Sequence, residues 1–233
     1  MALAHSPRIV TNGLISYIDA INPKSYPGSG TTMFDLSGNG KNGTSGGGLT
    51  YSTENGGRFD FNGINSVITF GDGNTFSPLS EFTIEVWFRS TGTTPTTGTL
   101  PGIFGGTYGM RLFVNSTNLN YRLNEQLLAS TKSISTPSSF DFYNGGWNCV
   151  TCQGSSSNSL MRIYLNGVLQ NETSVAWTGT TQWPTNSFNF GRDNNDSNYF
   201  FAGSMSSIRM YNTFLTNSQI SENFNALRGR YGL

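Results

Sequence analysis

The sequence carries little charge of either sign. Only 11% of its 233 residues are charged, thirteen acidic against thirteen basic, so the formal net charge is zero. Globular domains usually have about 25% charged residues. Lysine is especially rare and occurs only as Lys24, Lys41 and Lys132. Because nucleic-acid binding needs a basic surface that displaces counterions from phosphates, nucleic acid is excluded as the main partner.

Cysteine, histidine and long apolar runs are also scarce. Two cysteines cannot build a disulfide framework, and the single histidine, His5, precedes the first predicted strand. A serine-protease triad would therefore lack a base held in place. No apolar run approaches the ~18 residues of a transmembrane helix, and the first residues lack the basic and apolar regions of a secretory signal. We expect a protein that folds in a reducing cytoplasm and does not insert into membranes.

Glycine and aromatic residues are abundant. The chain has 29 Gly, 17 Phe, 10 Tyr and 4 Trp, and it is rich in Asn, Ser and Thr. Disordered chains lack aromatics and carry excess charge. A neutral, aromatic-rich and turn-rich composition is instead typical of an all-β domain, and this length is sufficient for one domain with a large core.

The clearest pattern is an alternation of apolar and polar residues over 81–89. Successive side chains of a strand point to opposite faces, so the segment is predicted to be a strand. The side chains expected to face the core are Phe82, Ile84, Val86 and Phe88. The other face, which we expect to be solvated, carries Glu81, Thr83, Glu85, Trp87 and Arg89.

Other segments predict further strands separated by Gly, Asn and Ser turns. They span residues 14–19, 58–61, 67–70, 110–114, 147–153, 161–165, 188–191 and 201–211. The pair Asn166-Gly167 predicts a type I′ hairpin turn, because both residues tolerate a positive φ. One helix is predicted over 216–227, with Thr216 and Gln219 as its capping box and Gly229 as its stop.

Two short motifs match known sites only in their spacing. Cys149 and Cys152 spell C-x-x-C, but residues three apart on a strand point to opposite faces about 10 Å apart. We expect two unpaired thiols, at least one of them in the core. Residues 38–43 read G-x-G-x-x-G, yet the glycine-rich sequence that follows cannot begin the helix that a dinucleotide site needs. We expect a turn held by the Asp35 carboxylate.

Several blocks of the sequence resemble the laminin-G-like, concanavalin A-like jelly-roll proteins. In the family's order they are residues 13–20, 22–32, 35–43, 59–63, 82–88, 147–151, 163–167 and 203–212. The opening block and the ending, 223–233, resemble more specifically stand-alone versions among virion proteins of tailed bacteriophages. The resemblance implies an all-β jelly-roll β-sandwich of two antiparallel sheets with one short C-terminal helix. It covers residues 13–233, which leaves residues 1–12 as an extended arm.

Enzymatic relatives of this fold suggest a test for catalysis. Laminarinase-type relatives carry their acid and nucleophile as carboxylates on one strand face, with an Asp between them. In this chain Thr83 occupies the middle position. Glu81 and Glu85 would lie about 13 Å apart along a strand, beyond the ~5 to 9.5 Å that glycosidase pairs use. We therefore expect no catalytic residues and no enzyme activity.

Calcium is the one cofactor that the resemblance raises, since laminin-G-like domains often hold this ion in rim loops. Residues 193–198 are rich in oxygen ligands, but Asn198 stands where an EF-hand requires Gly. Many relatives also have acidic residues where this chain has Asn62 and Asn65. Because fewer carboxylates weaken such a site, the sequence predicts no resident cofactor and leaves calcium as an open alternative.

Three aromatic residues in polar loop sequence are candidates for contact with glycans: Trp177, Trp183 and Tyr199. Large rings there can stack on sugars or can cap the ends of the sandwich. In the N-terminal arm, Ile9 and Val10 are the candidate residues for attachment to a neighbour, because the arm is too short to fold alone.

The resemblance implies a non-enzymatic virion structural protein, displayed on the phage surface as a capsid decoration, fibre or tail-appendage subunit. Its partners would be other virion proteins and, at the host surface, glycans. A near-zero net charge favours association, and we expect a homo-oligomer, with a trimer favoured. The alternatives are a lectin-like adhesion module not tied to a virion and a glycosidase whose carboxylates have moved.

Overall fold

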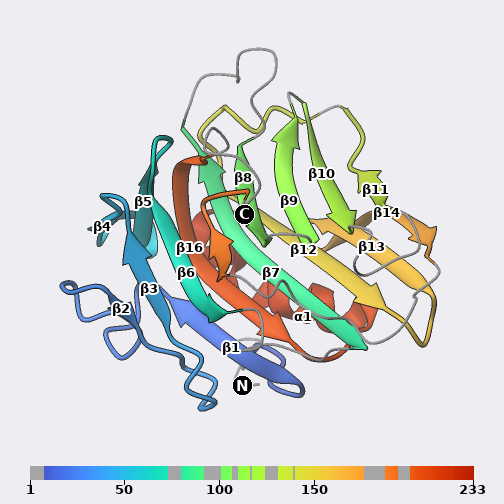
Figure 1. Ribbon diagram of the computed structural model, residues 1–233, viewed down its shortest axis with the longest axis horizontal. Coiled ribbons are helices and arrows are strands. Elements are labelled where there is room, and N and C mark those ends of the chain that lie inside the picture. The colour runs from blue at the N-terminus through green and yellow to red at the C-terminus, as the bar shows by residue number, and fades with distance from the viewer. Residues whose placement is uncertain are drawn as a thin grey trace, which may run out of the picture.

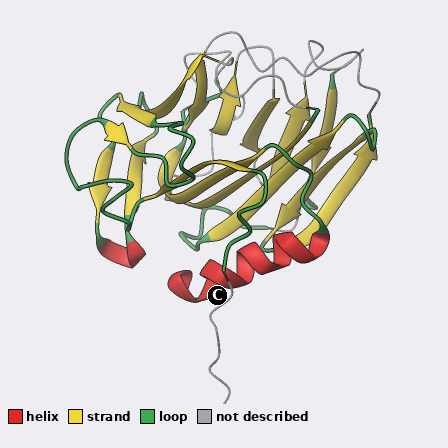
Figure 2. Cartoon of the chain, turned by 90° about the horizontal axis from the view of Figure 1, so that it is seen from below, coloured by secondary structure: helices red, strands yellow, loops and turns green. Residues whose placement is uncertain are grey.

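The computed structural model describes residues 8–72, 80–91, 101–106, 110–115, 117–123, 131–138, 140–175, 187–193 and 200–233. Within these ranges the chain forms two eight-stranded sheets, each paired in antiparallel fashion (Figure 1). A helical C-terminal segment lies along one side of the sandwich (Figure 2). The fold is thus the all-β jelly roll with a short C-terminal helix that the sequence predicted.

The first sheet, here called the helix-side sheet, has the order β14-β13-β12-β7-β16-β5-β4, and β1 also pairs with β16. Its strands are β1 (Leu14–Asp19), β4 (Thr50–Ser52), β5 (Arg58–Asn62), β7 (Glu81–Ser90), β12 (Asn148–Ser155), β13 (Leu160–Leu165), β14 (Val168–Ser174) and β16 (Ala202–Tyr211). The helix α1 (Asn217–Leu227) and the 3₁₀ helix η3 (Arg228–Tyr231) cover its outer face, and a short 3₁₀ helix, η1 (Glu54–Gly56), links β4 to β5.

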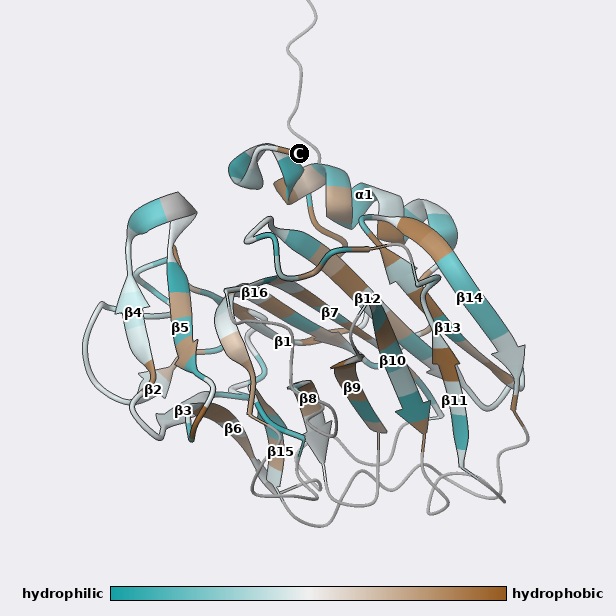
Figure 3. Cartoon of the chain, turned by 90° about the horizontal axis from the view of Figure 1, so that it is seen from above, coloured by the Kyte–Doolittle hydropathy of each residue, from teal (hydrophilic) through white to brown (hydrophobic). Residues whose placement is uncertain are grey.

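The second sheet, here called the front sheet, has the order β11-β10-β9-β8-β15-β6-β3-β2. Its strands are β2 (Thr32–Met33), β3 (Gly43–Gly46), β6 (Val67–Asp72), β8 (Gly102–Gly106), β9 (Met110–Asn115), β10 (Asn118–Leu123), β11 (Lys132–Ser135) and β15 (Ser187–Phe190). The layers follow one another as α1, helix-side sheet and front sheet (Figure 3). The front sheet therefore has no helix on its outer side among the described residues.

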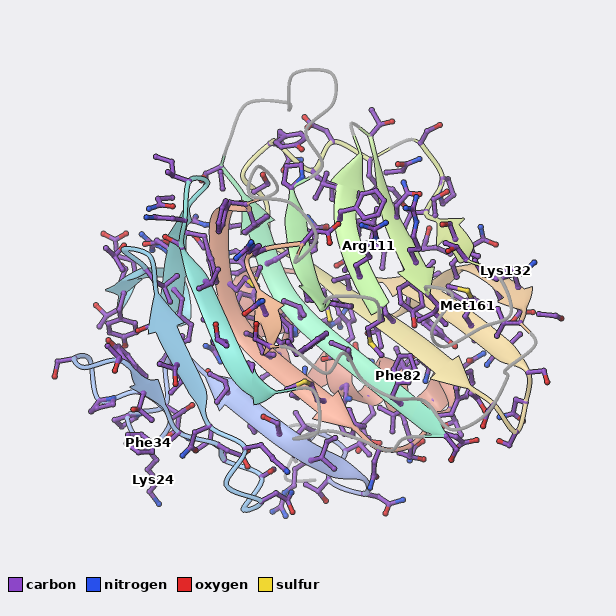
Figure 4. The ribbon with its side chains drawn as sticks, viewed as in Figure 1. Lys24, Phe34, Phe82, Arg111, Lys132 and Met161 are labelled. Atoms are coloured by element: carbon purple, nitrogen blue, oxygen red, sulfur yellow. The ribbon has the colours of Figure 1, made fainter. Side chains whose placement is uncertain are left out.

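A single apolar core fills the space between the sheets. Phe82, Ile84, Val86 and Phe88 of β7 all belong to it, as the alternation predicted. Phe82 and Met161 are labelled in Figure 4, where Lys24 and Phe34 lie at the periphery. The side chains of β7 fix which sides of the two sheets meet, and hence which side of the front sheet faces away from the core.

Local sequence patterns predicted many of the strands and turns correctly. The strands predicted at 14–19, 58–61, 67–70, 110–114, 147–153, 161–165, 188–191 and 201–211 all exist, with ends shifted by no more than two residues. The type I′ turn is confirmed, since φ is +51° at Asn166 and +77° at Gly167. Asp35 holds its turn as expected, because its carboxylate accepts hydrogen bonds from the backbone N–H groups of Tyr17, Ser37 and Lys41. The segment after the glycine motif is β3, not a helix.

The C-terminal helix begins as predicted and ends differently. The Thr216 hydroxyl accepts a hydrogen bond from the Gln219 N–H, and the Gln219 side-chain oxygen accepts one from the Thr216 N–H, which completes the capping box. Gly229 is not the stop: the chain tightens into η3, and the left-handed residue that ends it is Gly232, with φ +75°. No described helix is long and apolar enough to cross a membrane.

The prediction that one face of β7 is solvated is wrong. Thr83, Glu85 and Trp87 are each 0% exposed, because α1 and η3 pack over them. Alternation showed that the two faces of β7 differ, but both are buried along most of the strand, and of the predicted solvated residues Glu81 and Arg89 alone are partly exposed. The polar residues on the second face meet partners from β12, β16 and α1 in place of water.

The two cysteines behave as the strand prediction required. Both are free and buried on β12. Cys152 lies in the core, and Cys149 is on the other face, beside Glu85. Burial raises the pKa of both thiols well above the ordinary value, so neither is a reactive thiolate at neutral pH.

Candidate functional site on the outer face of the front sheet

A row of residues, all polar except Gly105, crosses the whole outer face of the front sheet. Each of its members stands directly opposite the next across a pair of strands, so all point the same way. In order from β2 to β11 they are Thr32, Thr44, Thr69, Asn189, Gly105, Arg111, Arg122 and Ser133. We call this set the polar row. Strands lie about 4.8 Å apart, so eight strands carry the row over about 33 Å.

The composition of each strand explains why the row is polar. On β9 and β10 the residues that belong to the core are Met110, Leu112, Val114, Leu119, Tyr121 and Leu123. The alternate positions therefore point outward, and they hold Arg111 and Phe113 on β9 and Asn118, Asn120 and Arg122 on β10. The same alternation on β6 places Thr69 outward between Ile68 and Phe70.

Two guanidinium groups and one aromatic ring form the centre of this face. Arg111 and Arg122 stand directly opposite each other, and Arg111 is labelled on β9 in Figure 4. Their guanidinium carbons lie 6.0 and 5.5 Å from the centroid of the Phe113 ring. Phe113 is only 2% exposed. It therefore supports the two cations and offers no open ring for stacking.

The charges at this centre are unevenly compensated. The Asp193 carboxylate, 1% exposed, accepts a hydrogen bond of 3.1 Å from Arg111. Arg122 donates from Nε to the Ser133 hydroxyl at 3.0 Å, and it makes no ion pair with a described carboxylate. Burial and then the neighbouring Arg111 charge lower the pKa of Arg122, against an opposing effect of Asp193. Arg122 is thus the cation of this face with the least electrostatic support.

The other half of the row consists of hydroxyl and amide groups. The Thr69 hydroxyl donates to the Asn189 carbonyl oxygen at 2.8 Å, and the Asn189 amide donates to the Ser187 hydroxyl at 3.3 Å. Thr32 and Thr44 continue the row to the edge of the sheet. Thr32, Thr44 and Thr69 are partly or fully exposed, whereas Asn189 is 3% exposed. The groups of this half that a ligand can reach are therefore hydroxyls, which both donate and accept hydrogen bonds and so suit a ligand rich in hydroxyls.

The candidate glycan contacts Trp177, Trp183 and Tyr199 lie outside the described residues. Sequence reasoning missed the residues of the polar row, although one signal was present. Residues 118–123, Asn-Leu-Asn-Tyr-Arg-Leu, alternate as strictly as β7 does. A search for exposed aromatic rings passes over such a strand, because its outward side chains are amides and a guanidinium.

The carboxylates examined for catalysis lie on the other sheet. Glu85 is 0% exposed beneath α1 and pairs with Arg209. Glu81 accepts hydrogen bonds from Ser155 and Ser157, and these bonds hold its pKa below the ordinary value in spite of its partial burial. A general acid in a glycosidase needs a raised pKa and a partner within reach. Neither residue has this combination.

The residues considered for calcium have structural roles where they are described. Asp193 bonds to Arg111, and residues 194–198 lie outside the described ranges. Asn62 accepts hydrogen bonds from the N–H groups of Asn65 and Ser66, and its amide donates to the Asn65 side chain. Within the described part of the chain, no three His, Cys, Asp or Glu side chains gather as a metal site.

The two attachment candidates lie at the start of the described chain. Val10 is 9% exposed and packs with Tyr211, Leu215 and Ile220 of its own chain. Its N–H donates to the Asn223 side chain at 2.8 Å, and its carbonyl accepts from the Tyr211 hydroxyl at 3.1 Å. Ile9 is partly exposed. Of the two, Ile9 has the side chain that a neighbour could reach.

Comparison with known proteins places the chain within a family. Residues 61–221 match the sequence profile of the family described as the concanavalin A-like lectin/glucanases superfamily. No curated protein sequence matches the chain.

Several solved structures are similar to this chain in fold. The binding domain of Paraclostridial Mosquitocidal Protein 1 has 17% identity and a TM-score of 0.73, over 93% of this chain and 52% of that one. The binding domain of Botulinum Neurotoxin DC, in complex with SialylT, has 17% identity and a TM-score of 0.67, over 94% and 52%. This chain therefore spans about half the length of those toxin domains.

Domain 4 of AbnA, an extracellular arabinanase from Geobacillus stearothermophilus in complex with arabinotriose, is similar over nearly its whole length. It has 18% identity and a TM-score of 0.64, over 90% of this chain and 97% of that domain. At these identities the likeness establishes the fold.

Proposed function

The chain belongs to the concanavalin A-like lectin/glucanases superfamily, and we propose that it is a non-enzymatic carbohydrate-binding domain that binds glycans on the outer face of its front sheet. The polar row carries this proposal. A saccharide presents hydroxyl groups at intervals along its length, and hydroxyl, amide and guanidinium groups in register can meet them as donors and acceptors. The row spans eight strands, about 33 Å. Its central members Asn189 and Gly105 are buried, so a glycan would contact the partly or fully exposed residues on either side of them.

The position of the carboxylates supports binding without hydrolysis. Glycoside hydrolysis needs two carboxyl groups that flank the scissile bond. Beside the polar row lies Asp193, whose carboxylate is engaged by Arg111. Glu81 and Glu85 belong to β7 of the helix-side sheet, and Glu85 is enclosed beneath α1.

Two similar structures lend support from outside the chain. The toxin domain is described in complex with SialylT, and the arabinanase domain in complex with arabinotriose. The arabinanase domain is matched over 97% of its length and the toxin domain over 52%, so the arabinotriose complex is the stronger support for a saccharide-binding role of this fold.

The test is binding of the purified chain to a glycan array. Two single variants are compared with it, each of which removes one amide, from the front sheet or from the helix-side sheet. Asn120→Ala takes an outward amide from the front sheet, and Gln170→Ala takes a partly exposed amide from edge strand β14. We expect Asn120→Ala to weaken binding about two- to tenfold, the value of one neutral hydrogen bond, and Gln170→Ala to leave it unchanged. The protein should release no reducing sugar from a bound glycan. Absence of binding to every glycan, or equal effects of the two variants, would contradict the proposal.

We propose in addition that the domain is displayed on the surface of a tailed-phage virion as a homo-oligomer, with a trimer favoured. The support is the resemblance of the first and last parts of the sequence to phage virion proteins. These parts lie together in the fold: Arg230 bonds to both carboxylate oxygens of Asp19, at 2.8 and 3.0 Å. They form one structural unit, which fits a stand-alone virion domain.

Immunogold labelling of purified phage particles with an antibody to this chain tests the location. We expect gold at regular sites on the capsid or the tail. A chain that lacks residues 2–9 loses Ile9 but keeps Val10 and its hydrogen bonds, so it should fold but should not be incorporated if the arm is the attachment element. Label confined to free protein would exclude a virion role, and full incorporation of the shortened chain would place attachment elsewhere.

A further inference from the structure

We propose that the saccharide bound by the front sheet is acidic and that its carboxylate pairs with Arg122. This inference rests on the proposed function, because it names the class of ligand for the same face. It is carried by the geometry of two cations in register, of which one has a carboxylate partner and the other does not.

The first step concerns the opposed cations. Arg111 and Arg122 face each other across an antiparallel pair, where like charges destabilise a sheet. Asp193 compensates Arg111 from the turn that follows β15. Among the described residues no carboxylate forms an ion pair with Arg122, and Asp193, whose charge also acts on Arg122, is already paired with Arg111. A carboxylate from a ligand would give each of the two cations an anionic partner, in the order anion, cation, cation and anion.

The second step concerns the free donors of Arg122. A guanidinium has five N–H donors in a planar fork that matches a carboxylate. Only Nε is used within the described chain, toward the Ser133 hydroxyl. Contact with the Phe113 ring, 5.5 Å from the guanidinium carbon to the centroid, and the hydrogen bond to Ser133 together orient the fork. Its terminal nitrogens are thus prepared for a bidentate contact with little loss of side-chain freedom.

The third step concerns the neighbourhood, which is that of a sugar site. Ser133 lies one strand away from Arg122, and Asn120 lies two residues along β10 on the same face. The backbone positions of Ser133 and Asn120 lie about 5 and 7 Å from that of Arg122, the scale of one pyranose ring. A hexuronic or sialic acid could therefore place its carboxylate on Arg122 and its ring hydroxyls on the hydroxyl and amide. Burial and then the Arg111 charge lower the pKa of Arg122, and a bound anion would relieve the second of these effects.

The experiment compares matched acidic and neutral glycans on the array: oligogalacturonates against their methyl esters, and sialylated glycans against the same glycans without sialic acid. Arg122→Gln removes the charge, and Arg122→Lys keeps the charge without the fork. Arg162→Gln, on β13 of the helix-side sheet, is the matched control. We expect wild-type protein to bind the acidic member at least tenfold more tightly. Arg122→Gln should lose about ten- to a hundredfold of this binding, Arg122→Lys should lose part of it, and Arg162→Gln should lose none.

The outcomes separate this inference from the proposed function. Equal binding of acidic and neutral glycans, or full binding by Arg122→Gln, overturns the acidic ligand and leaves a carbohydrate-binding domain. Preference for sulfated over carboxylated glycans also overturns it, and binding of no glycan overturns both. Thermal unfolding serves as the folding control: the midpoint of Arg122→Gln should equal or exceed that of wild type, because the substitution removes a like-charge contact.

Discussion

Arg209→Met is expected to destabilise the fold by about 3 to 5 kcal/mol, as measured by equilibrium urea unfolding. Arg209 of β16 stands directly opposite Glu85 of β7, and the two side chains form an ion pair in which both are 0% exposed. Removal of the guanidinium leaves the Glu85 carboxylate in a dry site with the Asn223 amide as its remaining polar contact from α1. The cost of a buried charge without its counterion is the source of the expected effect.

The double variant Glu85→Gln with Arg209→Met tests this explanation. It removes both charges, so most of the lost stability should return. The matched control is Arg162→Met, because Arg162 pairs with Glu172 at a partly exposed site, with side chains 23% and 48% exposed. An exposed pair contributes about 0 to 1 kcal/mol. If Arg209→Met and Arg162→Met were equally mild, the buried pair would not be what stabilises this face.

Trp87→Ala is expected to cost about 3 to 5 kcal/mol and to loosen the C-terminal segment selectively. The Trp87 ring is 0% exposed. It stacks on Tyr231 with centroids 4.1 Å apart and on Phe224 with centroids 5.5 Å apart. One ring of the helix-side sheet thus contacts both α1 and η3, and its loss would leave a cavity at the centre of their contact with the sheet.

Hydrogen exchange distinguishes loosening from uniform destabilisation. In Trp87→Ala the amides of α1 and η3 should exchange faster relative to those of β9 and β10, which lie in the front sheet. Phe34→Ala is the control, because that ring is 45% exposed and its removal should change stability by about 0.5 kcal/mol or less. A loss of protection spread evenly over both sheets would show that Trp87 supports the sandwich as a whole and not the C-terminal segment.

Phe224 illustrates how the structure refines an expectation from periodicity. A helical stripe of Ile220, Phe224 and Leu227 suggests three core residues, yet Ile220 alone of these is fully buried. The ring of Phe224 stacks flat on Trp87 at an interplanar angle of 3° and stays partly exposed. The helix buries Asn223 instead, whose side chain bonds to Val10, Glu85 and Tyr211.

The sequence by itself determined the elements whose causes are local. Alternation placed β1, β7 and β16, the Asn166-Gly167 pair placed a hairpin, and Thr216 with Gln219 placed the start of α1. Each of these depends on residues within a few positions of one another. Two of the missed strands carry no such signal: β8 reads Gly-Ile-Phe-Gly-Gly, and β2 is two residues long. Strand β10 was missed although it alternates strictly.

Tertiary structure alone decided which polar faces meet water. Alternation separates the two faces of a strand but does not say what covers them, because the covering element can come from anywhere in the chain. Glu85 is buried because residues of α1, 138 positions away at Asn223, pack over it and Arg209 stands opposite. Alternation points Arg111 and Arg122 outward. They stay partly exposed because the front sheet has no helix on that side among the described residues. The polar row depends on the register of eight strands, and no local sequence pattern predicts that register.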